Sequence, residues 1–311
     1  MFLRGLIVSE QPLDYVPQDW HNVQAADEMD VSRYFEYDDD AIFQLRKWLR
    51  LDQAAPKTIV EIGCGGGYFT GKLVAMASAL KEIWAVEPDD VLREYASRKF
   101  SSQVKFLKGT AEKIPLSEEF AHLTACHIVL SNLPDVPRAV AEMARVTKKD
   151  GIVAAIEPGE SRMHYSPDPK LNEMEEKVLQ AYGKAIWELR TQRFDFSKDL
   201  KKKNARYPEV FNNCGLRNVE VHGLLSVFLL SDPRRDATEI LGWLRKRVFL
   251  LERDWDRTKL MLQRGGLEGR DIQAYFEAEK AYLENLIEHP EQISKTHELQ
   301  TYSRTVTIGF K

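Results

Sequence analysis

The stretch that decides the fold reads Val60-Glu61-Ile62-Gly63-Cys64-Gly65-Gly66-Gly67-Tyr68-Phe69. An apolar run leads into it and a helical pattern leaves it, which predicts a strand, a tight turn and a helix. Glycines at alternate positions of the turn let the chain bend sharply and bring bare backbone against a ligand. The start of the following helix offers unpaired N–H groups. Taken alone, the same stretch could also be a tight turn without a ligand.

A second acidic position follows at the end of the next apolar run, Ile83-Trp84-Ala85-Val86-Glu87-Pro88. A carboxylate about 20 residues after a glycine turn, at the end of the next strand, can hold both hydroxyls of a ribose. An exposed acid at a strand end is the alternative. Dinucleotide-binding turns place a pyrophosphate on the helix N-terminus. Here Glu61 precedes the first glycine, where it would repel a phosphate and suits a cationic or amine-bearing ligand.

The surrounding sequence alternates short apolar runs with helical patterns. Such alternation predicts the α/β class, with a parallel sheet covered by helices on both faces. The apolar runs cover 58–62, 82–86, 104–107, 123–129 and 151–156, and the helical patterns cover 69–80, 89–99 and 135–147. Further helices are predicted within 34–51, 171–189, 208–214, 234–262 and 270–289, and strands at 219–230, with Gly223 as a bulge, and 304–310. Residues 1–33 show no period and are expected to form an arm or loop.

These segments resemble the class I methyltransferases that use S-adenosylmethionine (SAM), and within them the subgroup related to ubiquinone/menaquinone-biosynthesis methyltransferases. The resemblance is strong over 58–159 and weaker toward the C-terminus. It implies a doubly wound, seven-stranded, mostly parallel, Rossmann-like sheet whose last three strands follow the order six, seven, five. The expected domains are an N-terminal arm and helix (1–55), a SAM-binding domain (56–231 plus 301–311) and a helical insertion or cap between strands six and seven (232–300).

The resemblance also assigns residues to SAM and to its product, S-adenosylhomocysteine. The glycine motif would hold the methionine and ribose part, Glu87 the ribose hydroxyls, and Pro88 would lie near the adenine. The segment Gly109–Pro115 resembles the motif that closes over adenine, with Thr110 where relatives usually carry Asp. The implied cofactor-binding residues are Glu61, Gly63, Cys64, Gly65, Gly67, Glu87, Pro88, Thr110, Ala111, Glu112 and His127.

Methyl transfer from a sulfonium is an in-line displacement, so the protein chiefly has to align the reactants. A general base is needed only when the acceptor is protonated. His127, at the end of the fourth strand, is the candidate catalytic base, and packing against the cofactor is its alternative role. Tyr34, Tyr37 and His164 are candidate substrate contacts by position, with ordinary packing or loop roles as alternatives.

Composition limits the partners. The 311 residues carry 44 Lys and Arg against 48 Asp and Glu, a net charge of −4 that argues against a DNA-binding protein. Three separated cysteines indicate neither a metal site nor a disulfide framework, and the sequence shows neither a membrane-spanning run nor a signal peptide, so the cytoplasm is expected. The oligomeric state is not indicated.

Three functions remain open on the sequence. The leading hypothesis is a SAM-dependent methyltransferase acting on a small or medium-sized acceptor. A methyltransferase for protein or tRNA is the second, because basic residues cluster in 198–206 and 245–247. The third is a SAM-binding partner or scaffold protein without catalysis. The acceptor atom is not readable from these residues.

Overall fold

The parallel half of the central sheet comes from the part of the chain that alternates strands and helices. The computed structural model describes residues 20–21, 24–53, 57–159, 163–193 and 206–311. Five strands run parallel in the order β3-β2-β1-β4-β5, as expected for short, nearly continuous apolar runs buried on both faces. They are β1 (Lys57–Ile62), β2 (Leu80–Val86), β3 (Val104–Leu107), β4 (Ala121–His127) and β5 (Thr147–Pro158).

The remaining strands extend this sheet with antiparallel pairings. Strand β8 (Leu299–Phe310) pairs antiparallel with β5 on one side and with β7 (Arg217–Leu229) on the other. The predicted order of the last three strands is therefore confirmed. The sheet has eight strands instead of the expected seven, because β6 (His164–Tyr165) pairs with Gln300 and Leu299 at the start of β8.

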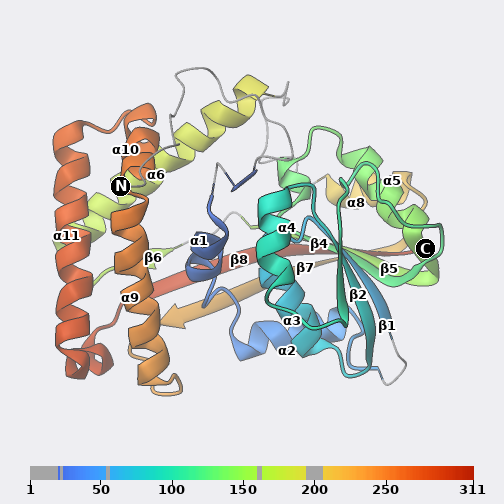
Figure 1. The fold of residues 1–311 in the computed structure, drawn as a ribbon, viewed down its shortest axis with the longest axis horizontal. Helices are drawn as coiled ribbons and strands as arrows, with labels where there is room; N and C mark the ends of the chain where they lie inside the picture. Colours follow the sequence, from blue (N-terminus) through green and yellow to red (C-terminus); the bar gives the residue numbers. More distant parts are fainter. Residues whose placement is uncertain (1–19, 22–23, 54–56, 160–162, 194–205) are drawn as a thin grey trace.

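Helices cover both faces of the sheet (Figure 1). One core packs alternate residues of β1 and β2, such as Ile59 and Ile83, against α2 (Asp39–Trp48) and α3 (Tyr68–Met76). The other packs Val60 and Ile62 against α5 (Val136–Val146) and α8 (Tyr207–Asn213). The alternation of neighbours between two cores is the period of two expected of a strand. Helix α4 (Asp90–Ser97) lies beside β3.

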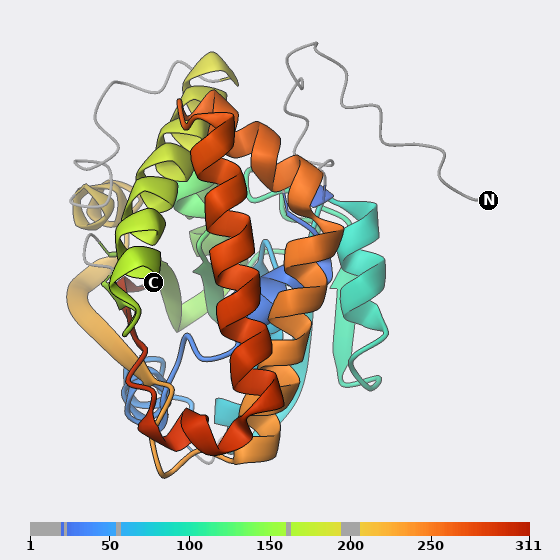
Figure 2. The same ribbon diagram turned by 90° about the vertical axis from the view of Figure 1, so that its left-hand side faces the viewer.

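Beyond one end of the sheet stands a layer of helices, which faces the viewer in Figure 2. It contains α9 (Ala237–Arg253), α10 (Trp255–Arg264) and α11 (Gly269–Glu288), which lie between β7 and β8, together with α6 (Pro169–Arg193) from an earlier part of the chain. Leu130–Asn132 and Pro290–Lys295 form short 3-10 turns. The close approach of α10 to α6 requires Gly265, since a Cβ there would lie 2.0 Å from the carbonyl oxygen of Ala181.

Several expected details are wrong. The helix expected over 234–262 is broken at Asp254 into α9 and α10. Gly223 is not a bulge, because it pairs regularly with Thr305; the register shifts between Arg217 and Glu220, where Asn218 has a φ of 48°. The helix expected within 34–51 begins at Asp39, because the side chain of Asp38 caps it by accepting from the amide of Ala41 at 2.8 Å.

The expected N-terminal arm contains a helix, α1 (Ala26–Ser32). Figure 1 shows α1 between the helical layer and the sheet. Val31 and, just after the helix, Phe35 join a core made by Phe228 of β7 and Trp243 of α9. Residues 1–19 and 22–23 of the expected arm lie outside the described residues.

Candidate functional site

The glycine turn joins β1 to α3 through three left-handed residues. Gly63, Gly65 and Gly67 have φ angles of 66°, 53° and 86°, a region that favours glycine. A Cβ at Gly63 would lie 2.5 Å from a methyl group of Val129, so the turn also needs a bare backbone there. The turn therefore presents backbone, with Gly67 directly before the N-terminal residue of α3.

Glu61 lies beneath this turn and is 1% exposed. Its carboxylate accepts a hydrogen bond from the hydroxyl of Thr70 at 2.5 Å. Burial raises the pKa of Glu61 to about 8, the Thr70 hydrogen bond opposes that rise, and the nearby Glu87 adds to it. No cation among the described residues pairs with the buried Glu61 carboxyl, so a cationic group placed beside it would favour its ionised form.

Glu87 connects the second strand to the glycine turn. One of its carboxylate oxygens accepts from the amide of Gly65 at 2.8 Å and the other from the amide of Asp89 at 3.0 Å. Burial raises the pKa of Glu87 to about 7, against the effect of these two hydrogen bonds. Pro88 follows half-buried, and Asp89 caps α4 by accepting from Val91 and Leu92. The carboxylate is thus held in place beside the turn.

The third predicted motif follows β3 at the same edge of the sheet, since the C-terminal ends of parallel strands lie together. Ala111 is buried in the core that contains Val86, whereas Thr110 and Glu112 are half-buried. A Cβ at Gly109 would lie 2.6 Å from the ring of Pro115, which explains the glycine at the start of this loop. Cys64 and Cys126 are buried and unpaired, and burial raises the pKa of both thiols.

The loop after β4 is held by a residue whose role the sequence did not reveal. The carboxylate of Glu157, at the end of β5, accepts from the amides of Val129, Leu130 and Ser131 at 2.9, 2.8 and 3.1 Å. Ile128 adopts a φ of 57°, which is rare for a β-branched residue, and turns the chain directly after His127. Glu157 therefore stabilises a strained turn at the point where His127 leaves the sheet.

His127 faces a buried cluster of polar groups, which we call the aromatic–acid cluster: Glu36, Tyr37, Tyr68, His127 and Arg304. Its imidazole stacks on Phe69 with ring centroids 4.8 Å apart, and its Nε2 lies 3.6 Å from a carboxylate oxygen of Glu36. Among the described residues, the hydroxyls of Tyr37 and Tyr68 and the Nε2 of His127 have no hydrogen-bond partner. Buried polar atoms without partners are uncommon in folded proteins, and several together indicate a place for a ligand.

Three members of this cluster, Glu36, Tyr68 and Arg304, were not predicted as site residues. Glu36 is 1% exposed and forms an ion pair with Arg304 of β8. The guanidinium of Arg304 is itself buried, which lowers its pKa to about 10. The sequence pointed to this region only through Tyr37, the neighbour of Glu36. The ion pair itself could not be predicted, because Glu36 and Arg304 stand near opposite ends of the chain.

The histidine is neutral at physiological pH. Burial and, to a smaller extent, the positive charge of Arg33 lower the pKa of His127 to about 3, against the opposing effect of Glu157. A neutral imidazole with a free Nε2 can accept a proton or a hydrogen bond.

Two of the predicted substrate contacts lie elsewhere. Tyr34 is 40% exposed and its hydroxyl donates to Glu239 of α9 at 2.8 Å. His164 is enclosed by Glu175 and Glu298, with nitrogen–oxygen distances of 2.9 and 3.3 Å. The structure thus brings Tyr37 and His127 together, and places Tyr34 and His164 in contact with the helical layer instead.

Helix α1 covers the glycine turn from outside. Met29 packs beside Gly65, Ala26 beside Gly66, and the hydroxyl of Tyr95 donates to Asp30 at 2.8 Å. Within the described part of the chain, no group of three or more His, Cys, Asp or Glu residues could hold a metal ion. None of the described helices combines the length and apolar character needed to cross a membrane.

Comparisons with known proteins agree with this geometry. A family model described as a methyltransferase domain matches residues 60–155. The methyltransferase YcgJ of Bacillus subtilis, itself uncharacterized, is 30% identical over 124 residues, which cover 38% of this chain and 46% of that protein. The ubiquinone/menaquinone biosynthesis C-methyltransferase UbiE of Campylobacter jejuni is 27% identical over 103 residues, 32% of this chain and 43% of that protein. The chain thus spans less than half the length of these relatives.

A solved structure shows the same fold. Phosphoethanolamine N-methyltransferase 2 of Haemonchus contortus, in complex with S-adenosylhomocysteine, superposes with a TM-score of 0.50 at 11% identity, over 96% of this chain and 60% of that one. This structural likeness extends the fold to the whole sheet. The segment that the family model matches, residues 60–155, contains both Glu61 and Glu87. Residues 60–155 are therefore a methyltransferase domain of class I, the fold family whose cofactor is S-adenosylmethionine.

Proposed function

We propose that this chain transfers a methyl group from SAM to a small or medium-sized acceptor. The observation that supports this function best is a juxtaposition at one sheet edge. Backbone of the glycine turn lies beside the buried carboxyls of Glu61 and Glu87, and the aromatic–acid cluster with its unpartnered atoms adjoins them through Tyr68 and Phe69. The glycine turn with its two carboxyls suits the binding of a cofactor, and the aromatic–acid cluster suits the binding and activation of an acceptor.

The charge of the site suits SAM. The pKa values of both Glu61 and Glu87 are raised by burial, so both carboxyls would gain from a nearby positive charge. Bound SAM supplies a methyl group on a positively charged sulfur, which departs as a neutral thioether. Glu87 would hold the ribose hydroxyls, Glu61 and the glycine turn would hold the methionine part, and Pro88 with Thr110, Ala111 and Glu112 would enclose the adenine.

The aromatic–acid cluster would act on the acceptor. No described residue forms a hydrogen bond with the Nε2 of His127, and the imidazole is neutral, so this nitrogen would accept the proton of a protonated nucleophile or orient a nucleophile without one. The hydroxyls of Tyr37 and Tyr68 would orient the acceptor. Glu36 and Arg304 touch each other and Glu36 approaches His127, so we assign them a positioning role.

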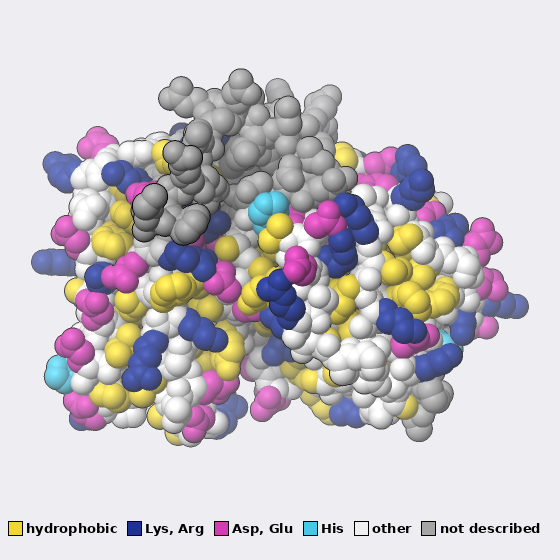
Figure 3. Space-filling model, in the orientation of Figure 1, with side chains coloured by type: hydrophobic (Ala, Val, Ile, Leu, Met, Phe, Trp, Pro, Cys, Tyr) yellow, Lys and Arg dark blue, Asp and Glu magenta, His cyan; other side chains and the backbone are white. Residues whose placement is uncertain are grey.

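A small acceptor is favoured over RNA or protein. UbiE, by its name, methylates carbon in the biosynthesis of ubiquinone and menaquinone. The basic cluster at 245–247 also offers less positive charge for docking than the sequence suggested, because Arg247 is buried against Glu279 and Glu298. In Figure 3, acidic and basic side chains intermingle across the visible face. Residues 198–205 of the other cluster lie outside the described residues.

The free cysteines are consistent with the expected cytoplasmic location.

Labelled methyl transfer tests this function. Purified protein is incubated with methyl-labelled SAM and a cell extract, and the products are separated by size and by treatment with ribonuclease or protease. Label in small molecules is expected. Label that disappears with ribonuclease or protease would establish a macromolecular acceptor, and tight SAM binding without any transfer would establish a non-catalytic protein.

A further inference from the structure

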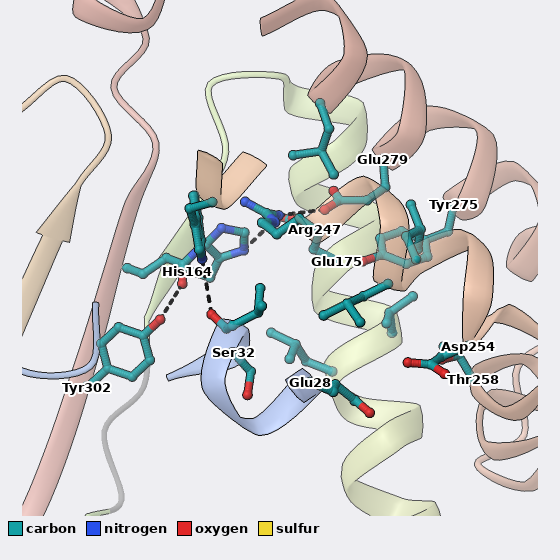
Figure 4. A pocket seen from close by; sticks show the side chains of 18 residues that line it. Glu28, Ser32, His164, Glu175, Arg247, Asp254, Thr258, Tyr275, Glu279 and Tyr302 are labelled. Atoms are coloured by element: carbon teal, nitrogen blue, oxygen red, sulfur yellow. Dashed lines mark hydrogen bonds and ion pairs between the residues drawn. The ribbon is translucent and has the colours of Figure 1, made fainter. Parts of the chain in front are cut away.

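A second candidate site lies between α1 and the helical layer. It is a cavity of about 330 Å³, which we call the helical-layer cavity (Figure 4). This volume lies at the small end of the range of ligand pockets. Val31 and Ser32 of α1 line it, whereas Ala26 and Met29 of the same helix pack on the glycine turn. Helix α1 therefore separates this cavity from the site described above.

The inner wall of the cavity is charged. Arg247 of α9 contacts Glu279 at 2.5 Å and Glu298 at 3.2 Å. His164 lies 2.9 Å from Glu175 and 3.3 Å from Glu298. These contacts raise the pKa of His164 to about 9 in spite of its burial, so the imidazole is protonated at neutral pH. Two cations thus meet three carboxylates.

Both cations are already paired, whereas Glu279 keeps a carboxylate oxygen without a partner in the described part of the chain. The side chain of Glu279 is 6% exposed and lines the cavity. Its Oε1 contacts Arg247, whereas its Oε2 has no hydrogen-bond partner among the described residues. Burial, together with Glu175 and Glu298, raises the pKa of Glu279, while Arg247 opposes the rise. The unpartnered oxygen of Glu279 would therefore be stabilised by a positively charged hydrogen-bond donor, whereas both cations of this wall already have carboxylate partners and would gain little from an anion.

An apolar wall is formed by side chains of α1, α6, α9 and α11: Val31, Val178, Leu179, Trp243, Leu250, Leu251 and Leu283. The polar side chains of Glu28, Ser32, Asp254 and Thr258 also line the cavity. An apolar wall facing a few fixed polar groups is the usual composition of a small-molecule pocket. The occupant that satisfies both walls carries an ammonium group at one end and a hydrocarbon body at the other.

We propose that the helical-layer cavity binds a small amphipathic amine whose ammonium group donates to Glu279. A carboxylate ligand is excluded by the same wall, because it would place a fourth negative charge beside three. The proposal concerns binding alone and stands whether or not the chain transfers methyl groups.

Three probes of matched shape test the charge preference: phenethylamine, 2-phenylethanol and phenylacetate. Their dissociation constants are measured by ligand-observed NMR on the full chain without SAM. Phenethylamine is expected to bind about tenfold or more tightly than 2-phenylethanol, because a charged hydrogen bond in a buried site is the stronger one. No saturable binding is expected of phenylacetate.

Two variants locate the site. Glu279→Gln is expected to weaken phenethylamine binding about tenfold, whereas Glu277→Gln, on the exposed side of the same helix, is the matched control and should leave it unchanged. If Glu279→Gln fails to fold, Leu179→Trp, at a half-exposed position of the lining, should block the cavity instead. Equal binding of all three probes, preference for phenylacetate, or unchanged binding in the folded variants would overturn the proposal. Calorimetry with SAM alone separates its failure from that of the proposed function.

Discussion

Replacing Glu61 by Gln should make the ligand-free protein more stable at pH 8 and less able to bind SAM. The buried carboxyl has a pKa of about 8, against an ordinary value of 4.5. The unfolded chain therefore loses the proton of Glu61 at a lower pH than the folded chain does. Wherever the folded state holds more protons than the unfolded one, stability falls as pH rises. The ionisation of Glu61 thus lowers the free energy of unfolding progressively as the pH rises from about 4.5 to about 8.

The size of the effect follows from the same values. Between pH 5 and pH 8 the ionisation of Glu61 lowers the free energy of unfolding by about 3 kcal/mol. Glutamine has nearly the same shape, keeps an oxygen for the Thr70 hydroxyl and does not ionise. The variant should therefore exceed the wild type by about 3 kcal/mol more at pH 8 than at pH 5.

Urea unfolding at pH 5, 6, 7 and 8 measures this difference. Glu94→Gln, on an exposed position of α4, controls for the loss of one negative charge. In calorimetry, Glu61→Gln should also bind SAM less tightly, because a buried negative charge beside the cofactor is lost. A pH-independent difference between variant and wild type, or a variant that binds SAM as well as the wild type, would refute the role given to Glu61.

The remaining predictions concern the turn, the base and the ion network. Gly67→Ala places a side chain at φ 86° and 2.8 Å from Phe100, so urea unfolding should show a loss of about 2 kcal/mol. Gly71→Ala in α3, whose Cβ would make only ordinary contact with Phe100 at 3.8 Å, should be neutral or stabilising. His127→Gln should lower kcat about 100-fold with little change in SAM affinity. Since the pKa of His127 is about 3, the wild-type rate should show no loss from this group between pH 8 and pH 5, and a fall near pH 6.5 would contradict the assignment. Glu298→Gln removes a carboxylate whose pKa is lowered to about 2 and leaves Arg247 under-compensated, so chemical denaturation should show a cost of about 3 kcal/mol; an unchanged midpoint would refute it.

Local patterns were sufficient to predict the parallel half of the fold. Each strand from β1 to β5 is a short apolar run, and each helix between them shows its own period, so neighbouring residues carry the information. The cap of α5 is an example of such local information, because Asp135 accepts from the amide of Arg138 only three residues further on, at 3.0 Å. The extra strand β6 escaped prediction because its two residues become a strand only by pairing with Gln300 and Leu299.

The residues of the candidate site likewise fall into those that a local pattern predicted and those whose contacts come from distant parts of the chain. Glu61 and Glu87 were predicted because each stands at a fixed distance from the glycine turn, within one strand–turn–helix–strand unit. Glu36 was missed because its ion-pair partner, Arg304, lies near the other end of the chain. His164 was expected to contact substrate, but its two carboxylate partners come from α6 and from the residue before β8, and no local pattern reveals such contacts.

Calorimetric titration with SAM tests the central claim most directly. The wild type is expected to bind SAM one to one. Glu87→Gln, which removes the charge and one of the two acceptors at the proposed ribose position, should weaken binding about tenfold or more, while the exposed control Glu94→Gln should bind as the wild type does. A folded wild-type protein that does not bind SAM, or binding that is indifferent to Glu87→Gln, would contradict the account.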